Sequence, residues 1–571
     1  KSKLLFMKSS LKFYLVIIGS ILFNLVFWNE KLALNAVLFD VFAVASLFFL
    51  YPGGLKSQLV KWLLAAHLVT VFTVLFHNTV LSKIAFSSTL LLLAVFTQYT
   101  HRSAWYAAAS VLMNYVLSPA SLISHISTFK ADKLTLRSTT QKLRILVIPL
   151  LLLAVFLWIY GAANKVFFSI TNELGLLLDR YFDRIIDWVS WARIGFFLLG
   201  LLVTTGLLWK SAVLYFAERD NRQENDLTRT RHDLLVWQRS SWFDLLSILM
   251  GKFATGMLAL RNEHTTGVIS LLFLNLLLLF INGIDIVYVW FGFEDRSRLN
   301  LSAYVHEGTG MLIFSIIAAI IVLLFFFRGN LNFYQKNKWL RYGAYAWLIQ
   351  NTVLVISVVC RDYYYIERLG LAYKRIGVLF FLGLVLCGLV TVFIKIHQRK
   401  TAYFLLRINA WCVIVMMVAG SCIHWDEEIA RYNLSCKESI KVDVKFLLTL
   451  SDKTLPLLQN NKELLGATNA GDSKDQLNLS PLELFEYRKA EFLKNQAQFS
   501  WLSWNRADAV TMRRLNLQNT VQKVSKKIEA GPFNSSTRGR QAGNPGETSD
   551  IFSLRSAVVL PVWPHGFMEG Y

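Results

Sequence analysis

Long runs of apolar residues, separated by short polar stretches, dominate the first three quarters of the chain. A helix needs about 20 mostly apolar residues to cross a bilayer. Twelve runs approach or reach that length: 11–28, 33–51, 59–77, 79–98, 104–122, 145–162, 194–216, 265–290, 307–327, 342–360, 376–396 and 402–424. A thirteenth, 244–260, is weaker because Gly251 and Lys252 interrupt it. The pattern predicts an all-α fold, a polytopic transmembrane helix bundle of about 11–13 spans.

Basic stretches between these runs predict the topology, because Lys and Arg accumulate in cytoplasmic loops. Two spans separate each of four such stretches from the next: 130–144, 217–240, 328–341 and 395–400. All four are therefore expected on the cytoplasmic side, and residues 425–571 on the outer, periplasmic side. The five early runs disagree with this by one span if the chain starts inside.

The chain after the last run is less apolar and predicts a water-exposed part. Residues 435–530 show helical spacing of apolar side chains, as at Leu447, Leu455 and Leu458, and predict a small C-terminal helical extramembrane lobe. Residues 531–571 are rich in Gly, Pro, Ser and Arg, a composition typical of a disordered tail.

An amphipathic pattern lies near 166–192, where Asp179, Asp183 and Asp187 recur every four residues beside an apolar face. The stripe is either a metal-binding ridge or, as we favour, the wet side of a helix in the membrane interface. We divide the chain into an N-terminal transmembrane region with this helix, a transmembrane core, the lobe and the tail. Their bounds are 1–262, 263–434, 435–530 and 531–571.

The charge balance narrows the class of partner. The chain has 59 Lys and Arg against 37 Asp and Glu, but residues 425–571 are nearly neutral, with 19 basic and 17 acidic residues. The excess of +22 therefore belongs mainly to the membrane part. It indicates cytoplasmic loops and contact with lipid headgroups, not a nucleic-acid surface.

Common catalytic motifs are absent from the sequence. It contains no GxxxxGK[ST], GxSxG or CxxC, and His306-Glu307 begins an HExxH pattern that continues Gly-Thr-Gly. Cys422 and Cys436 flank the end of the last run, and two free thiols are favoured over a disulfide. We expect no cofactor and no metal site, and these absences leave open whether the protein is an enzyme.

Polar residues gather at the predicted outer ends of the later runs. Glu307 begins one run, where it either carries a proton or favours the positive end of the helix dipole. Arginines in the next outer loop suit an anionic headgroup or phosphate, or else anchor at the interface. The acidic run after the last span would pair with that loop as a clamp. The candidate polar cluster is Glu307, Arg361, Tyr365, Arg375, Asp426 and Arg431.

Three ionisable residues stand alone inside predicted spans: Asp40, His67 and Asp285. Each is more simply explained by packing, or by a position near a span edge, than by function. Asp40 is the most central of the three, so it is the first to mutate.

Three motifs carry a family resemblance: Tyr304-x-x-Glu307-Gly308, the loop from Arg361 through Tyr365 and Gly370-Leu371 to Arg375, and Ile429-Ala-Arg-Tyr-Asn433-Leu434. In this order they resemble an uncharacterised family of polytopic bacterial inner-membrane proteins, a domain of unknown function of the four-one-seven-three or four-one-five-three type. The motifs cover roughly 265–460, and the chain departs from the family at His306 and Ala372. The resemblance implies a multi-pass protein of the bacterial inner (cytoplasmic) membrane and no particular reaction.

Three functions fit these observations. We favour a non-catalytic membrane protein for transport, lipid handling or envelope assembly, whose partners are the lipid bilayer and an anionic lipid or small solute. The first alternative is an integral membrane transferase, with Glu307 or Asp426 as base and Arg361 or Arg375 holding an anionic lipid-linked donor. The second is a membrane sensor or scaffold that binds an envelope protein through its outer tail.

Overall fold

The computed structural model describes residues 2–129, 191–210, 214–228, 259–291, 301–327, 330–436, 442–467 and 480–517, with isolated positions between 149 and 156. These residues form helices and loops, and the strand-like pairing among them is a single bridge between Asp226 and Lys400. Eight of the described helices are long and apolar enough to cross a membrane, and the segments Leu11–Phe27, Leu34–Leu50 and Gly310–Phe326 are shorter apolar helices. The predicted all-α polytopic bundle is confirmed.

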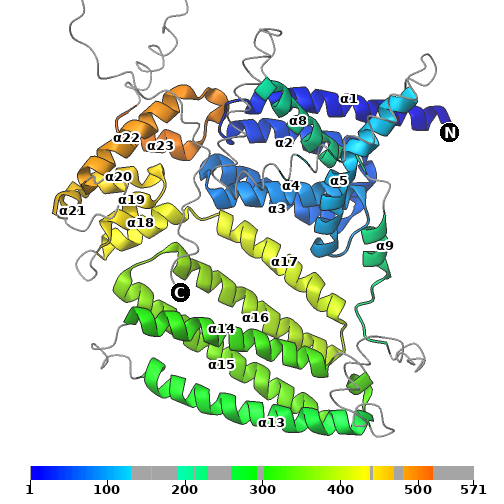
Figure 1. The fold of residues 1–571 in the computed structure, drawn as a ribbon, viewed down its shortest axis with the longest axis vertical. Coiled ribbons are helices and arrows are strands. Elements are labelled where there is room, and N and C mark those ends of the chain that lie inside the picture. Colours follow the sequence, from blue (N-terminus) through cyan, green and yellow to red (C-terminus); the bar gives the residue numbers. More distant parts are fainter. Residues whose placement is uncertain are drawn as a thin grey trace, which may run out of the picture.

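The membrane helices form two bundles joined by one helix (Figure 1). The first contains α1 (Ser2–Phe27), α2 (Leu34–Leu50), α3 (Gln58–Phe76), α4 (Val80–Gln98), α5 (Ala104–Phe129) and α8 (Trp191–Leu208). The second contains α13 (Ala259–Asp285, extended by a π-turn over Ile286–Trp290), α14 (Leu301–Phe326), α15 (Lys338–Leu369) and α16 (Tyr373–Gln398). Helix α17 (Ala402–Ser421) lies between them, packed on α16 on one side and on α3, α4 and α5 on the other.

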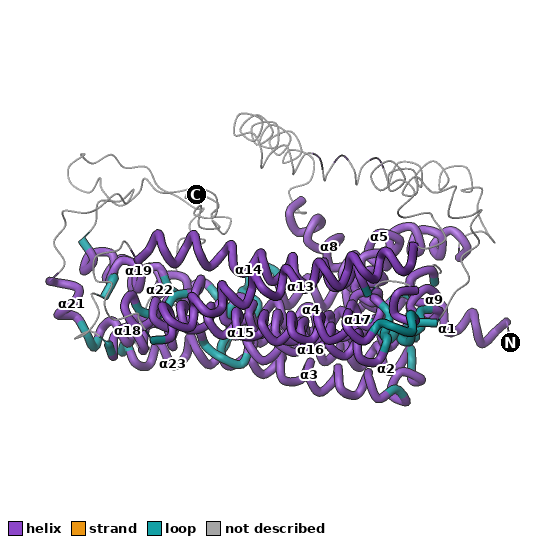
Figure 2. The backbone as a smooth tube through the Cα atoms, turned by 90° about the horizontal axis from the view of Figure 1, so that it is seen from below, coloured by secondary structure: helices purple, strands orange, loops and turns teal. Residues whose placement is uncertain are grey.

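The helices run side by side, so the molecule has two distinct ends (Figure 2). The lobe end carries the C-terminal helices. The opposite end, here called the basic end, carries α9 (Tyr215–Arg222) and the α16–α17 connection. Backbone hydrogen bonds join these two, from Thr401 N to Asn225 O (2.9 Å) and from Leu227 N to Arg399 O (2.9 Å). The described parts of the predicted basic loops 217–240, 328–341 and 395–400 therefore share one end, whereas 130–144 lies outside the described residues.

Basic side chains at helix ends bond to main-chain carbonyls. Lys395 Nζ donates to Phe327 O just beyond α14 (2.7 Å), and Arg341 donates to Ile396 O near the end of α16 (2.6 Å). The last carbonyls of a helix lack partners and carry the negative end of its dipole, so a cation there stabilises the end. Part of the basic excess is thus used inside the protein and not on lipid.

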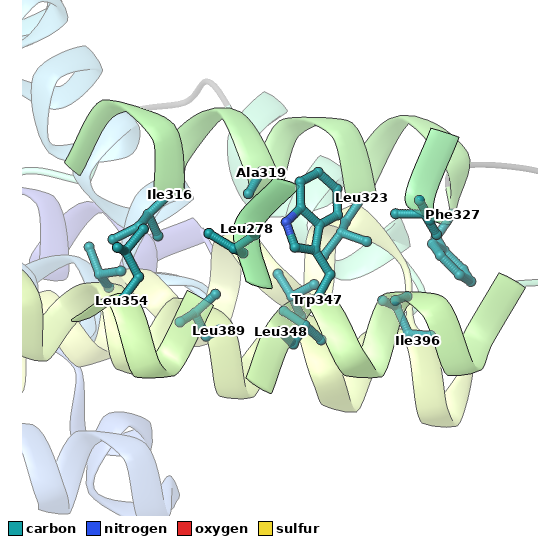
Figure 3. Close-up of a cluster of buried hydrophobic side chains, with 14 of the residues drawn as sticks. Leu278, Ile316, Ala319, Leu323, Phe327, Trp347, Leu348, Leu354, Leu389 and Ile396 are labelled. Carbon is teal, nitrogen blue, oxygen red and sulfur yellow. The ribbon is translucent and has the colours of Figure 1, made fainter. Parts of the chain in front are cut away.

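The second bundle contains a large cluster of buried apolar side chains. Figure 3 shows Trp347 of α15 lying among Leu278 of α13 and Ala319 and Leu323 of α14. Burial of such side chains contributes roughly 1.5–3 kcal/mol each in water, and in lipid the same close packing supplies dispersion energy. Polar contacts between α13 and α15 add to this core, among them the hydrogen bond from Asn275 Nδ2 to Gly343 O (3.0 Å).

The lobe follows the last span. Its helices are α18 (Trp425–Ser435), α19 (Val444–Thr449), α20 (Leu455–Gln459), α21 (Lys462–Ala467), α22 (Pro481–Gln498) and α23 (Arg506–Arg514). They share a core that includes Ile429, Leu455 and Phe485. The lobe docks on the α1–α2 connection, where Leu34 N donates to Trp504 O (3.2 Å) and Lys31 N to Ser503 Oγ (2.7 Å).

One predicted span is wrong at its end. The run 194–216 forms α8 only as far as Leu208, and α9 begins separately at Tyr215. The 18 residues of α8 already suffice for the hydrocarbon core, and Lys210 then belongs at the headgroup level. The predictions on 145–162, 166–192 and 531–571 lie almost wholly outside the described residues, as does most of 244–260. None of the five cysteines forms a disulfide.

Candidate functional site

Asp40 and His67, which stand alone in the sequence, meet in the middle of the first bundle. His67 Nε2 lies 2.8 Å from Asp40 Oδ1, and the two side chains are 0% and 7% exposed. The other ring nitrogen, Nδ1, lies 2.9 Å from Thr89 Oγ1. An aspartate, a histidine and a threonine from α2, α3 and α4 therefore form one continuous hydrogen-bonded line.

One arrangement of hydrogens satisfies the contacts of this line. In it, Thr89 Oγ1 donates to Ala85 O (2.8 Å), the usual threonine bond to the preceding turn, and accepts from His67 Nδ1–H. A further proton must then lie between Nε2 and Asp40, because two acceptors would otherwise face each other. This arrangement also leaves the pair without net charge, which an apolar interior strongly favours. In this arrangement the pair shares one proton in addition to the Nδ1 hydrogen.

Hydroxyl groups extend the line toward the lobe end. Thr70 Oγ1 lies 3.0 Å from Thr89 Oγ1, and Thr73 Oγ1 lies 3.5 Å from Ser421 Oγ of α17. On α3 the spacing of His67, Thr70 and Thr73 continues to His77, which follows the last helical residue. One face of α3 is thus polar from its centre to the lobe end, a distance of about 15 Å for ten helical residues.

Apolar residues lie on the other side of the Asp40–His67 pair, toward the basic end. One turn from the Asp40–His67 pair toward the basic end come Ala43, Leu63 and Leu93, which are 2%, 2% and 0% exposed. Leu47, Val60 and Phe96 follow one turn later and are equally buried. Polar side chains therefore lie between the Asp40–His67 pair and the lobe end, and two apolar layers lie between the pair and the basic end.

Two histidines and a lysine lie where the polar line reaches the lobe. The His77 and His424 rings stack with centroids 5.9 Å apart, and His77 Nδ1 and His424 Nε2 are buried without a hydrogen-bond partner in the described structure. Lys453 Nζ donates to His77 O (2.5 Å) and Asn78 O (2.7 Å). Burial lowers the pKa of both histidines, and the Lys453 charge lowers them further. Burial likewise lowers the pKa of Lys453 to about 8.

The predicted cluster at the lobe end does not converge on one site. Arg361 forms a buried ion pair with Asp285 of α13, so the third isolated residue also finds a partner. Arg375 lies 4.3 Å above the Tyr365 ring and donates to the carbonyls of Leu369 and Gly370. The contacts of Arg375 hold the α15–α16 turn. The side chain of Glu307, another member of the cluster, lies outside the described residues.

Of the other two members of the cluster, Asp426 contacts the α15–α16 turn and Arg431 does not. Asp426 accepts from Tyr373 Oη (2.5 Å), and Asn433 bonds both N and O of Leu371 (2.6 and 2.9 Å). Arg431 pairs with Glu427 and Glu428 of its own helix (3.0 and 2.8 Å). The acidic run thus reaches the α15–α16 turn as anticipated, but through Tyr373 and Asn433 in place of arginines.

A buried carboxylate at the basic end, Asp220, was not predicted from the sequence. Asp220 of α9 accepts from Arg102 N (2.7 Å), Ser103 N (3.1 Å) and His101 Nδ1 (3.1 Å), and from Tyr403 Oη (2.6 Å). Burial acts to raise its pKa, but these donors outweigh it and hold the pKa below the usual range. Asp220 ties α9 to the start of α5 and to α17, a structural role. The described residues contain no group of three potential ligands suited to a metal ion.

Comparison with known proteins gives a family and no function. The model of the family described as "Domain of unknown function (DUF4153)" matches residues 62–461, well over half of the chain. No curated protein and no solved structure matches. The match begins far upstream of the quoted motifs and includes His67 and Thr89, whereas Asp40 precedes it. The eight membrane-length helices make the chain an integral multi-pass membrane protein, and it belongs to the DUF4153 family.

Proposed function

We propose that the protein is a non-catalytic, proton-coupled transport protein in which the Asp40–His67 pair takes up and releases a proton. The observation that carries this proposal is the buried Asp40–His67–Thr89 line, polar toward the lobe end and sealed by apolar layers toward the basic end. Ionisable residues inside membrane helices are costly and mark proton or ion paths in pumps and transporters. The hydroxyl groups of Thr70, Thr73 and Ser421 supply steps by which a proton would reach the pair.

The proposal includes a location. Basic residues mark the cytoplasmic side, so the basic end faces the cytoplasm of a bacterium and the lobe faces the periplasm. The proton path then opens to the outer side of the inner membrane, where the proton concentration of a respiring cell is higher. Asp40 would be loaded from that side.

The two alternatives fare differently. A transferase needs its base and its donor-binding arginine in one cavity. Arg361, Arg375 and Asp426 each bond to separate structural partners, which lowers the support for this alternative. The sensor or scaffold alternative stays a prediction, since an envelope partner would bind the exposed faces of the lobe. We therefore keep transport as the proposal.

The experiment uses the purified full chain in proteoliposomes with an imposed proton gradient. Uptake of labelled solutes and anionic lipids is measured for the wild type, Asp40→Asn, His67→Gln and Asp226→Asn. Asp226 is a matched control because its carboxylate is exposed and pairs with Lys400 at the basic end. Gradient-driven uptake that is lost in Asp40→Asn and His67→Gln and kept in Asp226→Asn supports the proposal. Equal uptake in all four proteins contradicts it.

A further inference from the structure

A cavity opens at the basic end of the first bundle, away from the Asp40–His67 pair. Its volume is about 390 Å³, within the range of small-ligand sites. It lies between Gly53, Gly54 and Ser57 before α3, the segment 96–101 at the end of α4, and residues of and before α9. The spans α4 and α8 end here, at Gln98 and Leu208, so the cavity lies at the depth of lipid headgroups.

Lys210 supplies a cation to this cavity. Its Nζ lies 4.8 Å above the Tyr99 ring, and no carboxylate in the described residues forms an ion pair with it. Partial burial lowers the pKa of its ammonium group. An ammonium that is partly desolvated and paired only with a ring face gains more from an anion than a fully hydrated one does.

The remaining walls offer little opposing charge. Glu218 is the one carboxylate among the lining residues of the cavity, and it pairs with Arg222 at 3.3 Å. Ser57 precedes α3 without capping it through its side chain, so its hydroxyl is not used in a cap. A second cation is near: Lys12 lies 5.0 Å above the Tyr51 ring, and Tyr51 Oη donates to Leu208 O, two residues before Lys210.

We propose that this cavity binds a phosphate group, with Lys210 as its principal cation. Basic pockets between membrane helices on the cytoplasmic side recognise anionic headgroups in this way. The phosphate belongs either to an anionic phospholipid of the leaflet at the basic end or to a free phosphate in solution. The site is separate from the proposed proton path, and its test does not depend on transport.

The test measures binding by the purified full chain in a neutral detergent. Native mass spectrometry and thermal shift are used with short-chain phosphatidylglycerol, short-chain phosphatidylcholine and inorganic phosphate. The variants are Lys210→Gln and Glu218→Gln, with Lys56→Gln as matched control. Lys56 is an exposed lysine of the turn before α3 that also holds Gly53 and Gly54, and it does not line the cavity.

We expect phosphatidylglycerol to bind more tightly than phosphatidylcholine. Lys210→Gln should weaken that binding about tenfold, which corresponds to about 1.4 kcal/mol. Lys56→Gln should change it less than twofold, and Glu218→Gln should strengthen it because a negative charge leaves the wall. Binding of inorganic phosphate with the same pattern assigns the site to free phosphate, and its failure to bind assigns the site to the lipid.

Two results would overturn the proposal. One is that neither anionic probe binds more tightly than phosphatidylcholine. The other is that the affinity for phosphatidylglycerol is the same in wild type, Lys210→Gln and Glu218→Gln. Glu218→Gln keeps the proposal testable if Lys210→Gln fails to fold, because Glu218 is an exposed side chain and its substitution should leave the fold intact.

Discussion

The buried lysine between the lobe and the membrane helices gives a quantitative prediction. Burial lowers the pKa of Lys453 from 10.5 to about 8. One pKa unit corresponds to about 1.4 kcal/mol, so the docked lobe disfavours the protonated lysine by roughly 3 kcal/mol. Between these two pKa values the docked state binds fewer protons than the undocked state. Docking therefore becomes more favourable as pH rises through this window, by about 2 kcal/mol from pH 8 to pH 10.

The assay is pulse proteolysis in urea, which measures the free energy of releasing the lobe at pH 8 and at pH 10. The variant Lys453→Met keeps the length of the side chain and removes the titrating group, so its pH dependence should lose the contribution of about 2 kcal/mol. Lys462→Met is the control, because Lys462 is a half-exposed lysine of the same lobe that pairs with Glu486. The reasoning is refuted if Lys453→Met keeps the full wild-type pH dependence.

Three further predictions concern contacts of the lobe and of the basic end. The lowered pKa of His77 and His424 predicts that lobe docking weakens as pH falls below about 6.5, the ordinary histidine value. Pulse proteolysis between pH 7 and pH 5 should show a smaller weakening in His77→Phe/His424→Phe than in wild type. Gly370 has φ +81°, and a Cβ there would lie 2.5 Å from Asn433 Oδ1. Gly370→Ala should therefore destabilise the protein by about 1–3 kcal/mol, as measured by urea unfolding. Gly377→Ala is the control and should not destabilise the protein, because nothing lies within 4 Å of a Cβ at that position. Asp220→Asn leaves the hydrogen-bond donors around this position mismatched and should lower the free energy of unfolding by about 2–4 kcal/mol at pH 7. The difference from wild type should shrink below pH 4, where Asp220 becomes protonated, and thermal unfolding measured against pH checks both expectations.

The helices could be predicted from the sequence because an apolar run long enough to cross a bilayer allows few other structures. Eleven of the twelve predicted runs coincide with described helices, although 194–216 ends early at Leu208. Apolar periodicity alone does not show where a span ends. Lys210, inside that run, was the residue that marked the membrane surface.

The pairing of the polar residues was not predictable in the same way. Asp40 and His67 come from different helices, as do Asp285 and Arg361, and one-dimensional spacing carries no information on which helices touch. One signal was present: His67, Thr70, Thr73 and His77 fall on a single face of α3. Such a polar stripe on an otherwise apolar helix must face the protein interior, and it would have led to the candidate path.

The loop arginines show a second limit of prediction from sequence: residue type does not identify the partner of a side chain. Arg361 and Arg375 were predicted to bind an anion because arginine suits anionic ligands, yet their contacts are with Asp285 and with main-chain carbonyls. Residue type predicted the chemistry that these side chains are capable of. It did not predict that turns and helix ends of the same chain would use it.

The central claim is that the Asp40–His67 pair takes up a proton from the lobe end and releases it toward the basic end during the transport cycle. Its most direct test is proton movement into proteoliposomes, followed with an internal pH dye under an imposed inside-negative potential. The account predicts acidification above that of protein-free vesicles for wild type and for Asp226→Asn, and none above that level for Asp40→Asn. Acidification by Asp40→Asn at the wild-type rate would contradict it.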